Sequence, residues 1–130
     1  MIENLTMLTH LTIHASNIRD FTPLGNLTNL TNLDLQHNRI TEISALQLHR
    51  FPNLTELALW NNQITDITEL GRYTGLTLLA LGGNQISDTS SLKSLTNLHF
   101  LDLTNNPIPR VHILELSFAL PNTDIRSGDN

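Results

Sequence analysis

The sequence predicts an α/β solenoid in which each repeat adds one short strand to a parallel sheet and returns behind it through 3₁₀ turns or coil. Three observations carry this prediction: a recurring LxxLxLxxNxI pattern, a nearly constant step between its copies, and a different, helix-like segment near the C-terminus. All steps between the first leucines of successive copies are equal except the second, which is slightly longer. These first leucines are Leu8, Leu30, Leu54, Leu76 and Leu98.

The strand of each repeat is predicted from the L-x-L core of the pattern. Leucines spaced by three and then two residues cannot all share one face of a regular helix, whereas the alternate leucines of a strand point to the same side. Successive strands would stack about 4.8 Å apart in a parallel sheet. The residues beside and between the leucines are therefore expected on the opposite, solvent-facing side.

An asparagine follows each strand, where the chain has to turn. Its amide can bond the backbone of the neighbouring turn, and an unpaired backbone group in a buried bend costs about 1 to 3 kcal/mol. We therefore expect a buried structural ladder and no catalytic amides, with Ser16 in place of the asparagine in the first copy. The ladder consists of Asn38, Asn62, Asn84 and Asn106.

The return half of each repeat carries apolar residues at intervals of three, which is the spacing of a 3₁₀ turn. An acidic residue recurs just before the second apolar position, where its carboxylate would cap the turn. A calcium site is the weaker alternative, because such a site needs several oxygens at one point. The acidic residues are Asp20, Glu42, Asp66 and Asp88.

The final return contains a stretch with helical spacing between two prolines. Val111, Leu114 and Phe118 repeat at intervals of three and four residues, and Pro109 and Pro121 lie just outside the stretch. The sequence therefore predicts a helix over residues 110–119 whose apolar residues cover the C-terminal end of the core.

A last strand is expected over residues 120–125, because one further step of the common length after Leu98 reaches Leu120. In this register Asn122 is equivalent to Phe100, and Asp124 and Arg126 keep the edge of the sheet polar. Together with the helix, this strand forms a predicted C-terminal cap over residues 107–126 of a single domain that spans residues 1–130.

Composition narrows the function. The chain has 130 residues, no cysteine and a net charge of −5, without a basic cluster that would bind nucleic acid or an anionic membrane. It lacks a recognisable signal peptide and an apolar span of membrane length, which favours a cytoplasmic location over secretion or surface exposure. No HExxH, GxSxG or phosphate-binding loop occurs, so we expect neither an enzyme nor a cofactor, and a protein partner is the default.

The repeats LTNLTNLDLQHNRITEI, LTELALWNNQITDITEL and LTLLALGGNQISDTSSL resemble the 22-residue class of leucine-rich repeats, which includes bacterial internalins and eukaryotic phosphatase regulators of similar repeat length. The resemblance covers roughly residues 5–125. It implies a right-handed, curved solenoid with the strands on the concave face, a protein or peptide ligand bound to that face, and a bacterial origin.

Specific function should then lie in the variable strand positions, because the leucines are needed for the core. The centre of the predicted concave face is apolar and surrounded by acidic and amide residues, as in a protein-binding patch with an aromatic anchor. The alternative is that Trp60 folds over Gly82 and Gly83 as local packing. The candidate partner-binding residues are Trp60, Leu78, Phe100, Glu56, Asp34, Gln36 and Asp102.

Two further interpretations stay open. His10, His14 and His37 would share one region of this face, but no carboxylate or cysteine completes a metal site, and we expect a polar contact surface instead. The N-terminal end, with Leu5 and Met7 beside Met1 and Ile2, offers little polar covering. The chain could therefore self-associate end to end as a homodimer, or be part of a larger repeat protein such as an adhesin or a regulatory subunit.

Overall fold

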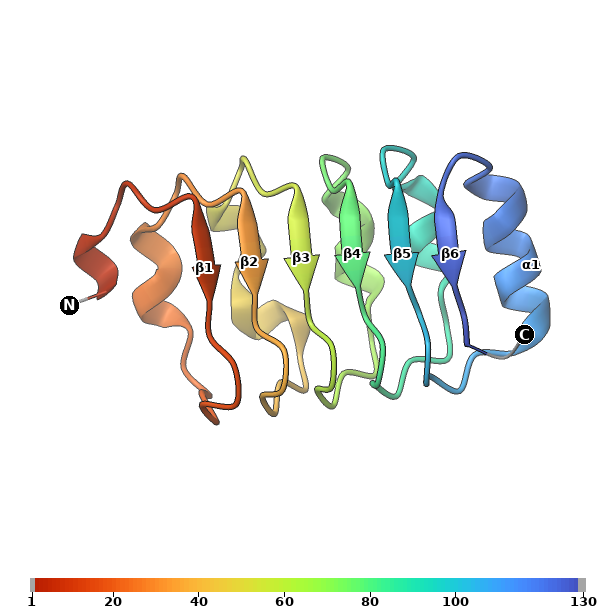
Figure 1. Ribbon diagram of the computed structural model, residues 1–130, viewed down its shortest axis with the longest axis horizontal. Coiled ribbons are helices and arrows are strands. Elements are labelled where there is room, and N and C mark those ends of the chain that lie inside the picture. The colour runs from red at the N-terminus through yellow and green to blue at the C-terminus, as the bar shows by residue number, and fades with distance from the viewer. Residues whose placement is uncertain (1, 129–130) are drawn as a thin grey trace.

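The computed structural model describes residues 2–128 as a row of stacked repeats (Figure 1). Six strands form one parallel sheet in the order β1-β2-β3-β4-β5-β6, which confirms the predicted one strand per repeat. The strands are β1 His10–Thr12, β2 Asn32–Asp34, β3 Glu56–Ala58, β4 Leu78–Ala80, β5 Phe100–Asp102 and β6 Asp124–Arg126.

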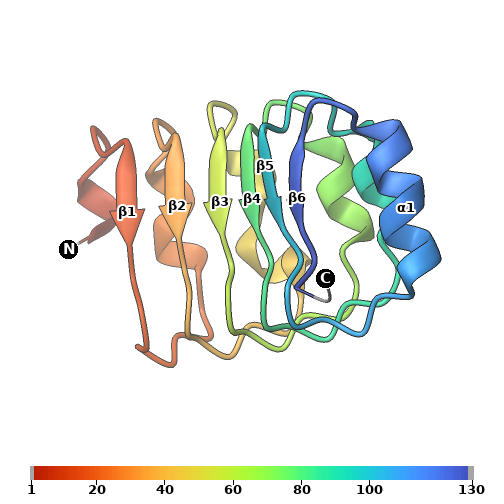
Figure 2. The ribbon, with the colours of Figure 1, turned by 45° about the vertical axis from the view of Figure 1, so that its right-hand side comes forward.

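The return segments form a second layer behind the sheet, as the turned view shows (Figure 2). They are 3₁₀ helices except for the last one, which is an α-helix, so the predicted contrast between the C-terminal return and the others is confirmed. Within residues 2–128 no helix is long and apolar enough to cross a membrane. The helix η1 Ile2–Asn4 precedes β1, and the returns contain η2 Thr22–Asn26, η3 Ile43–Leu46, η4 Leu48–Arg50, η5 Thr68–Arg72, η6 Ser90–Ser94 and α1 Arg110–Ala119.

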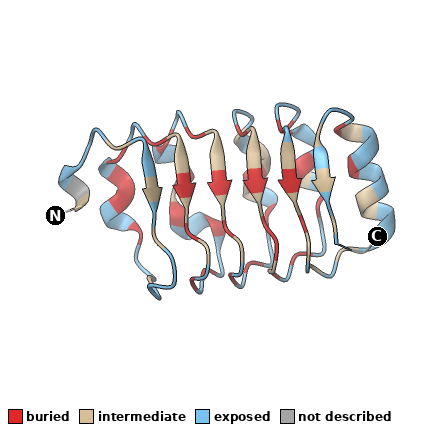
Figure 3. Ribbon diagram, viewed as in Figure 1, coloured by how far each residue is buried: buried red, intermediate tan, exposed pale blue. Residues whose placement is uncertain are grey.

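The core lies between the two layers and consists mainly of the repeated leucines. The central leucine of β2 to β5 is buried, whereas the residues on either side of it are half-exposed (Figure 3). Alternation along a strand produces this pattern, since neighbouring side chains point to opposite sides of the sheet. We call the side with the half-exposed residues the open face, because no return segment covers it.

Asparagine side chains connect the turns that follow the strands. Asn84 is buried; its amide nitrogen donates to the carbonyls of Leu59 and Leu81 at 3.0 Å, and its oxygen accepts from the N–H of Ile64 at 3.0 Å. Asn62 bonds the carbonyls of Leu35 and Leu59 and the N–H of Ile40 in the same way. Each amide thus satisfies backbone groups of two adjacent repeats.

The carboxylates predicted to cap the 3₁₀ turns do so in three returns. Asp66 accepts from the N–H of Thr68 at 2.9 Å, and Asp20 and Asp88 make the equivalent bonds in their own returns. The prediction is wrong for Glu42, whose side chain makes no cap bond. Its extra methylene group carries the carboxylate beyond the short reach that aspartate uses here.

The C-terminal helix is present at the predicted residues, but it buries a different face. Val111, Leu114 and Phe118 are exposed, and Leu116 is the residue that is fully buried. Ile113 is partly buried beside the core, so the inward stripe is offset around the helix from the expected one. Both stripes are apolar, and the spacing alone could not distinguish them.

The last strand also lies later than predicted. Asp124, not Asn122, pairs with Phe100, and Arg126 pairs with Asp102. The final register step is therefore longer than the step from β4 to β5, because the helix α1 lengthens the final return. Asp124 and Arg126 lie on the outer strand, where both are exposed.

Candidate protein-interaction surface

Strand register arranges the open face into parallel rows of side chains. Glu56 lies beside Leu78, and Leu78 lies beside Phe100, so the acidic residue is followed along the row by two apolar residues. In the second row, Ala58 and Ala80 separate acidic neighbours and keep the middle of the face shallow. The first row is His10, Asn32, Glu56, Leu78, Phe100 and Asp124, and the second is Thr12, Asp34, Ala58, Ala80, Asp102 and Arg126.

The N-terminal part of the open face is polar and internally bonded. The amide of Asn32 donates to the carboxylate of Glu56, which orients both side chains. Asp34 accepts from the side chain of Gln36 at 3.0 Å, and His14 Nε2 lies 2.9 Å from its other oxygen. These bonds hold the polar groups in place before a ligand arrives. A groove of about 270 Å³ runs across this part of the sheet and reaches Leu78.

Trp60 packs against Gly82 just beyond the strands. A Cβ atom on Gly82 would be 1.8 Å from Trp60 Nε1, so the indole occupies the space that any side chain there would need. The space over Gly82 is thus filled by Trp60, and the space over Gly83 is filled by the side chain of Asn61. Trp60 Nε1 is buried without a hydrogen-bond partner among the described residues, although the residue as a whole is half-exposed.

The histidines line up with this tryptophan. The rings of His14 and His37 meet edge to face at 6.2 Å, and those of His37 and Trp60 at 6.3 Å. His37 adopts a positive φ of 57° at the corner after β2, as Asn61 and Asn105 do at the equivalent positions of other repeats. The described residues include no group of three or more histidine or acidic side chains able to hold a metal ion.

The C-terminal part of the open face combines an aromatic ring with a charge. The guanidinium of Arg126 lies 5.9 Å from the ring centre of Phe100, within the range of a cation–π contact. Arg126 also donates two hydrogen bonds of 3.1 Å to Asp124, which raise the pKa of its guanidinium. Asp102 accepts from the N–H and hydroxyl of Thr104.

All seven residues expected from the sequence to bind a partner lie on or at the edge of the open face, but they do not form one cluster. Asp34 and Asp102 lie in the second row, and Gln36 lies beyond the end of β2. Glu56, Leu78 and Phe100 are direct neighbours in one row. Trp60 lies two residues beyond the end of β3, with Gly82 on one side and His37 on the other. The sequence did not predict the contact of Arg126 with Phe100, because the expected register placed Asn122 beside Phe100. In the structure Asp124 takes that place, which brings Arg126 one row closer to Phe100.

A family model for leucine-rich repeats in two copies matches residues 6–48, 28–72 and 74–122, which together take in almost the whole chain. No curated protein sequence is significantly similar to it. Among solved structures, an internalin of Listeria monocytogenes, InlF, is 36% identical with a TM-score of 0.84 over 97% of this chain.

Two other solved structures share the fold. A leucine-rich repeat protein of Leptospira interrogans is 29% identical, with a TM-score of 0.81 over 95% of this chain. The ectodomain of the receptor kinase SOBIR1 of Arabidopsis thaliana is 23% identical, with a TM-score of 0.63 over 91% of this chain and 67% of its own length. The chain spans only 37% of the internalin and 32% of the Leptospira protein.

Proposed function

Because the chain belongs to the leucine-rich repeat family and is similar to internalins, we propose that it is a non-enzymatic module that binds a protein or peptide on the open, concave face of its sheet. The observation that carries this proposal is the neighbouring pair Leu78 and Phe100, half-exposed between acidic and amide side chains. Large apolar groups surrounded by polar ones are typical of the energetic centre of an interface.

The shape of the surface supports the same proposal. Ala58 and Ala80 leave room above the middle strands, and the groove of about 270 Å³ ends at Leu78. A bound side chain could enter this groove and contact Leu78, while Asn32 and Glu56 accept or donate hydrogen bonds at its wall. Residues already held by Asn32–Glu56 and Gln36–Asp34 bonds lose little freedom on binding.

Peptides selected from a displayed random library against the wild-type chain test this proposal. We expect Leu78→Ala and Phe100→Ala each to weaken the selected peptides by at least about tenfold, and Trp60→Ala by about 2 kcal/mol or more. Val111→Ala, which truncates an exposed apolar residue on α1, is the matched control and should bind like wild type. Peptides that keep full affinity for the Leu78 and Phe100 variants would place the binding surface elsewhere.

Self-association through the ends of the solenoid is the second candidate, and one observation favours it. Large apolar residues are exposed at both ends: Met7 is 83% exposed at the N-terminal end, and Phe118 is 87% exposed at the C-terminal end. Met1, which was expected to contribute, lies outside the described residues. Light scattering distinguishes the candidates: a rising mass with concentration that Met7→Glu abolishes supports assembly, and a constant monomer mass contradicts it.

A further inference from the structure

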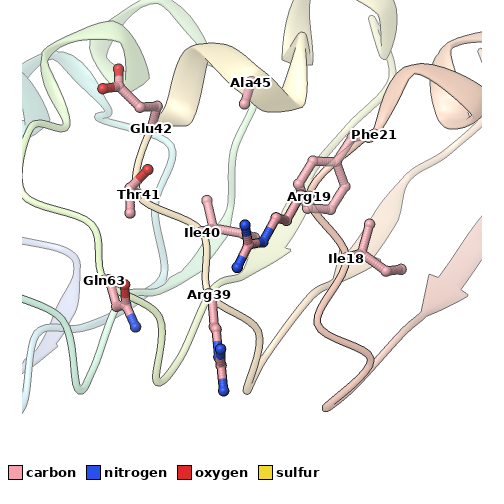
Figure 4. Close-up of a pocket in the computed structure, with 9 residues that line it drawn as sticks. All are labelled: Ile18, Arg19, Phe21, Arg39, Ile40, Thr41, Glu42, Ala45 and Gln63. Atoms are coloured by element: carbon pink, nitrogen blue, oxygen red, sulfur yellow. The ribbon is translucent and has the colours of Figure 1, made fainter.

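The groove of about 270 Å³ on the open face presents both apolar and charged side chains to a ligand. A larger hollow, of about 560 Å³ between the first two returns, is partly filled by the protein itself, because the Arg19 side chain lies in the space between Phe21 and Ile40 (Figure 4). In the groove, by contrast, Ala58 and Leu78 are both half-exposed. The groove therefore has apolar surface that a side chain of a ligand can cover.

Two carboxylates border this groove from neighbouring strands. Asp34 pairs with Ala58 across β2 and β3, and Glu56 lies two residues before Ala58 on β3. Alternation along a strand puts these three side chains on the same face. A strand spacing of about 4.8 Å and a rise of about 3.3 Å per residue place the Cα atoms of Asp34 and Glu56 about 8 Å apart. Ala58 carries only a methyl group, so a ligand group above it lies between the two carboxylates.

Hydrogen bonds orient both carboxylates and leave part of their accepting capacity unused. Asp34 accepts from the N–H and the side-chain amide of Gln36, and one of its oxygens lies 2.9 Å from His14 Nε2. Glu56 accepts from Asn32 through Oε2, and its Oε1 has no hydrogen-bond partner among the described residues. Because a carboxylate offers about four lone-pair positions, both groups can accept further hydrogen bonds, Glu56 most of all.

The surface around the groove is negatively charged. None of the residues that line the groove is a lysine or an arginine. In the two rows of the open face the one such residue is Arg126, which is bonded to Asp124 on the far strand β6. His14 adds a positive charge beside Asp34 only when it is protonated. Carboxylates beside an apolar surface complement a side chain that has an apolar stem and a cationic end.

We propose that the open face binds a peptide segment that places an arginine or lysine side chain in this groove. The methylene groups of that side chain cover Ala58 and Leu78. Its cationic end lies between Asp34 and Glu56 and donates hydrogen bonds to both. The inference rests on the proposed open-face function and adds to it the charge of the ligand.

The same segment places an apolar residue against Leu78 and Phe100, which adjoin the groove in the first row. Glu56 and Phe100 are two strands apart, about 10 Å, a distance that an extended peptide covers in about three residues. The expected ligand pattern is therefore a basic residue within about three residues of a leucine or an aromatic residue.

Selection of displayed random peptides, run in parallel on the wild-type chain and on the double variant Asp34→Asn/Glu56→Gln, tests this inference. Both substitutions remove a charge and keep an acceptor for the amides of Gln36 and Asn32. Circular dichroism should confirm that the double variant is folded. We expect arginine and lysine together to be at least about threefold enriched near an apolar residue in the wild-type peptides and not enriched in the others.

Calorimetry with one basic peptide selected on the wild type then tests the contact itself. Replacing its basic residue by glutamine, or Glu56→Gln in the chain, should each weaken binding about fivefold to tenfold. The two changes together should weaken it by less than the product, because both remove the same ion pair. Glu42→Gln removes one carboxylate from an exposed position on the return side, so it is the matched control and should bind like wild type.

The outcomes separate this inference from the proposed function. Peptides that bind through Leu78 and Phe100 without an excess of basic residues would overturn the inference and leave the open-face proposal standing. Basic peptides that lose equal affinity for Glu56→Gln and Glu42→Gln would also overturn it, because they respond to net charge alone. A selection that yields no peptide sensitive to Leu78→Ala or Phe100→Ala would overturn the open-face proposal and this inference with it.

Discussion

Gly82→Ala should displace Trp60 from the sheet. The added Cβ would lie 1.8 Å from Trp60 Nε1, 2.5 Å from its Cδ1 and 2.8 Å from the hydroxyl oxygen of Thr104. An ordinary contact begins near 3.4 Å, so the indole has to retreat by about 1.6 Å. A ring packed this closely against the backbone cannot move that far without tilting away from Gly82.

The cost can be worked out from what the indole loses and regains. Trp60 is half-exposed, so it covers roughly 100 Å² that tilting would expose, which corresponds to about 2.5 kcal/mol at ~25 cal/mol per Å². The Nε1–H group is now buried without a partner. In the tilted state it could donate a hydrogen bond to water, which would recover about 1 kcal/mol. We therefore expect Gly82→Ala to lower the free energy of unfolding by about 1.5 kcal/mol.

Trp60 is the only tryptophan, so its fluorescence reports the movement directly. Emission of the folded Gly82→Ala variant should shift to longer wavelength, and urea unfolding followed by circular dichroism should give the reduced stability. Gly75→Ala is the matched control, because its Cβ would be 3.7 Å from the nearest atom, the carbonyl oxygen of Leu54. Unchanged emission and stability in Gly82→Ala would refute the packing of Trp60 on Gly82.

Three further predictions follow from the packing and the capping bonds. Asn84→Ala should lower the free energy of unfolding by about 3 kcal/mol in urea titrations, because it leaves several buried backbone groups unpaired; a loss below about 1 kcal/mol would contradict this. Leu116→Ala should lower the free energy of unfolding by about 2 to 4 kcal/mol and Leu114→Ala by under about 1 kcal/mol; the reverse order would mean that α1 packs with the face predicted from the sequence. Hydrogen bonds from the hydroxyl and N–H of Thr68 lower the pKa of Asp66, so its contribution to stability is complete above the usual aspartate pKa of about 4 and is lost as the pH falls through the lowered value. Asp66→Asn should therefore reduce the acid dependence of the unfolding midpoint, and an identical dependence would exclude this role.

The sequence predicts those parts of the fold that repeat. Leucine and asparagine recur with the period of the structure, so the position of β2 to β5 could be read from spacing alone. Prediction failed where two patterns were equally consistent with spacing. On α1, the stripe of Val111, Leu114 and Phe118 and the stripe of Ile113 and Leu116 both have helical periodicity, and only packing against η6 selects the second.

The candidate surface was predictable in composition but not in detail. Alternation along the strands was enough to place Leu78 and Phe100 on the exposed side. The position of Trp60 depends on whether the indole or another group fills the space over Gly82. The sequence does not decide between the two, whereas the structure shows the indole there. The longer step from Leu30 to Leu54 is visible in the sequence, but it does not by itself say that the extra residues divide the second return into η3 and η4.

Departures from the common repeat length are absorbed on one side of the molecule. The pairs β2–β3 and β5–β6 both have a longer register step than the other pairs, yet their strands pair like those of the shorter repeats. The additional residues enter the returns, where they divide one into η3 and η4 and accompany the helix α1 in the other. Strand pairing fixes the number of residues on the open face, so that face can vary only in side-chain identity. The return side can also vary in length, as the second and the last returns do.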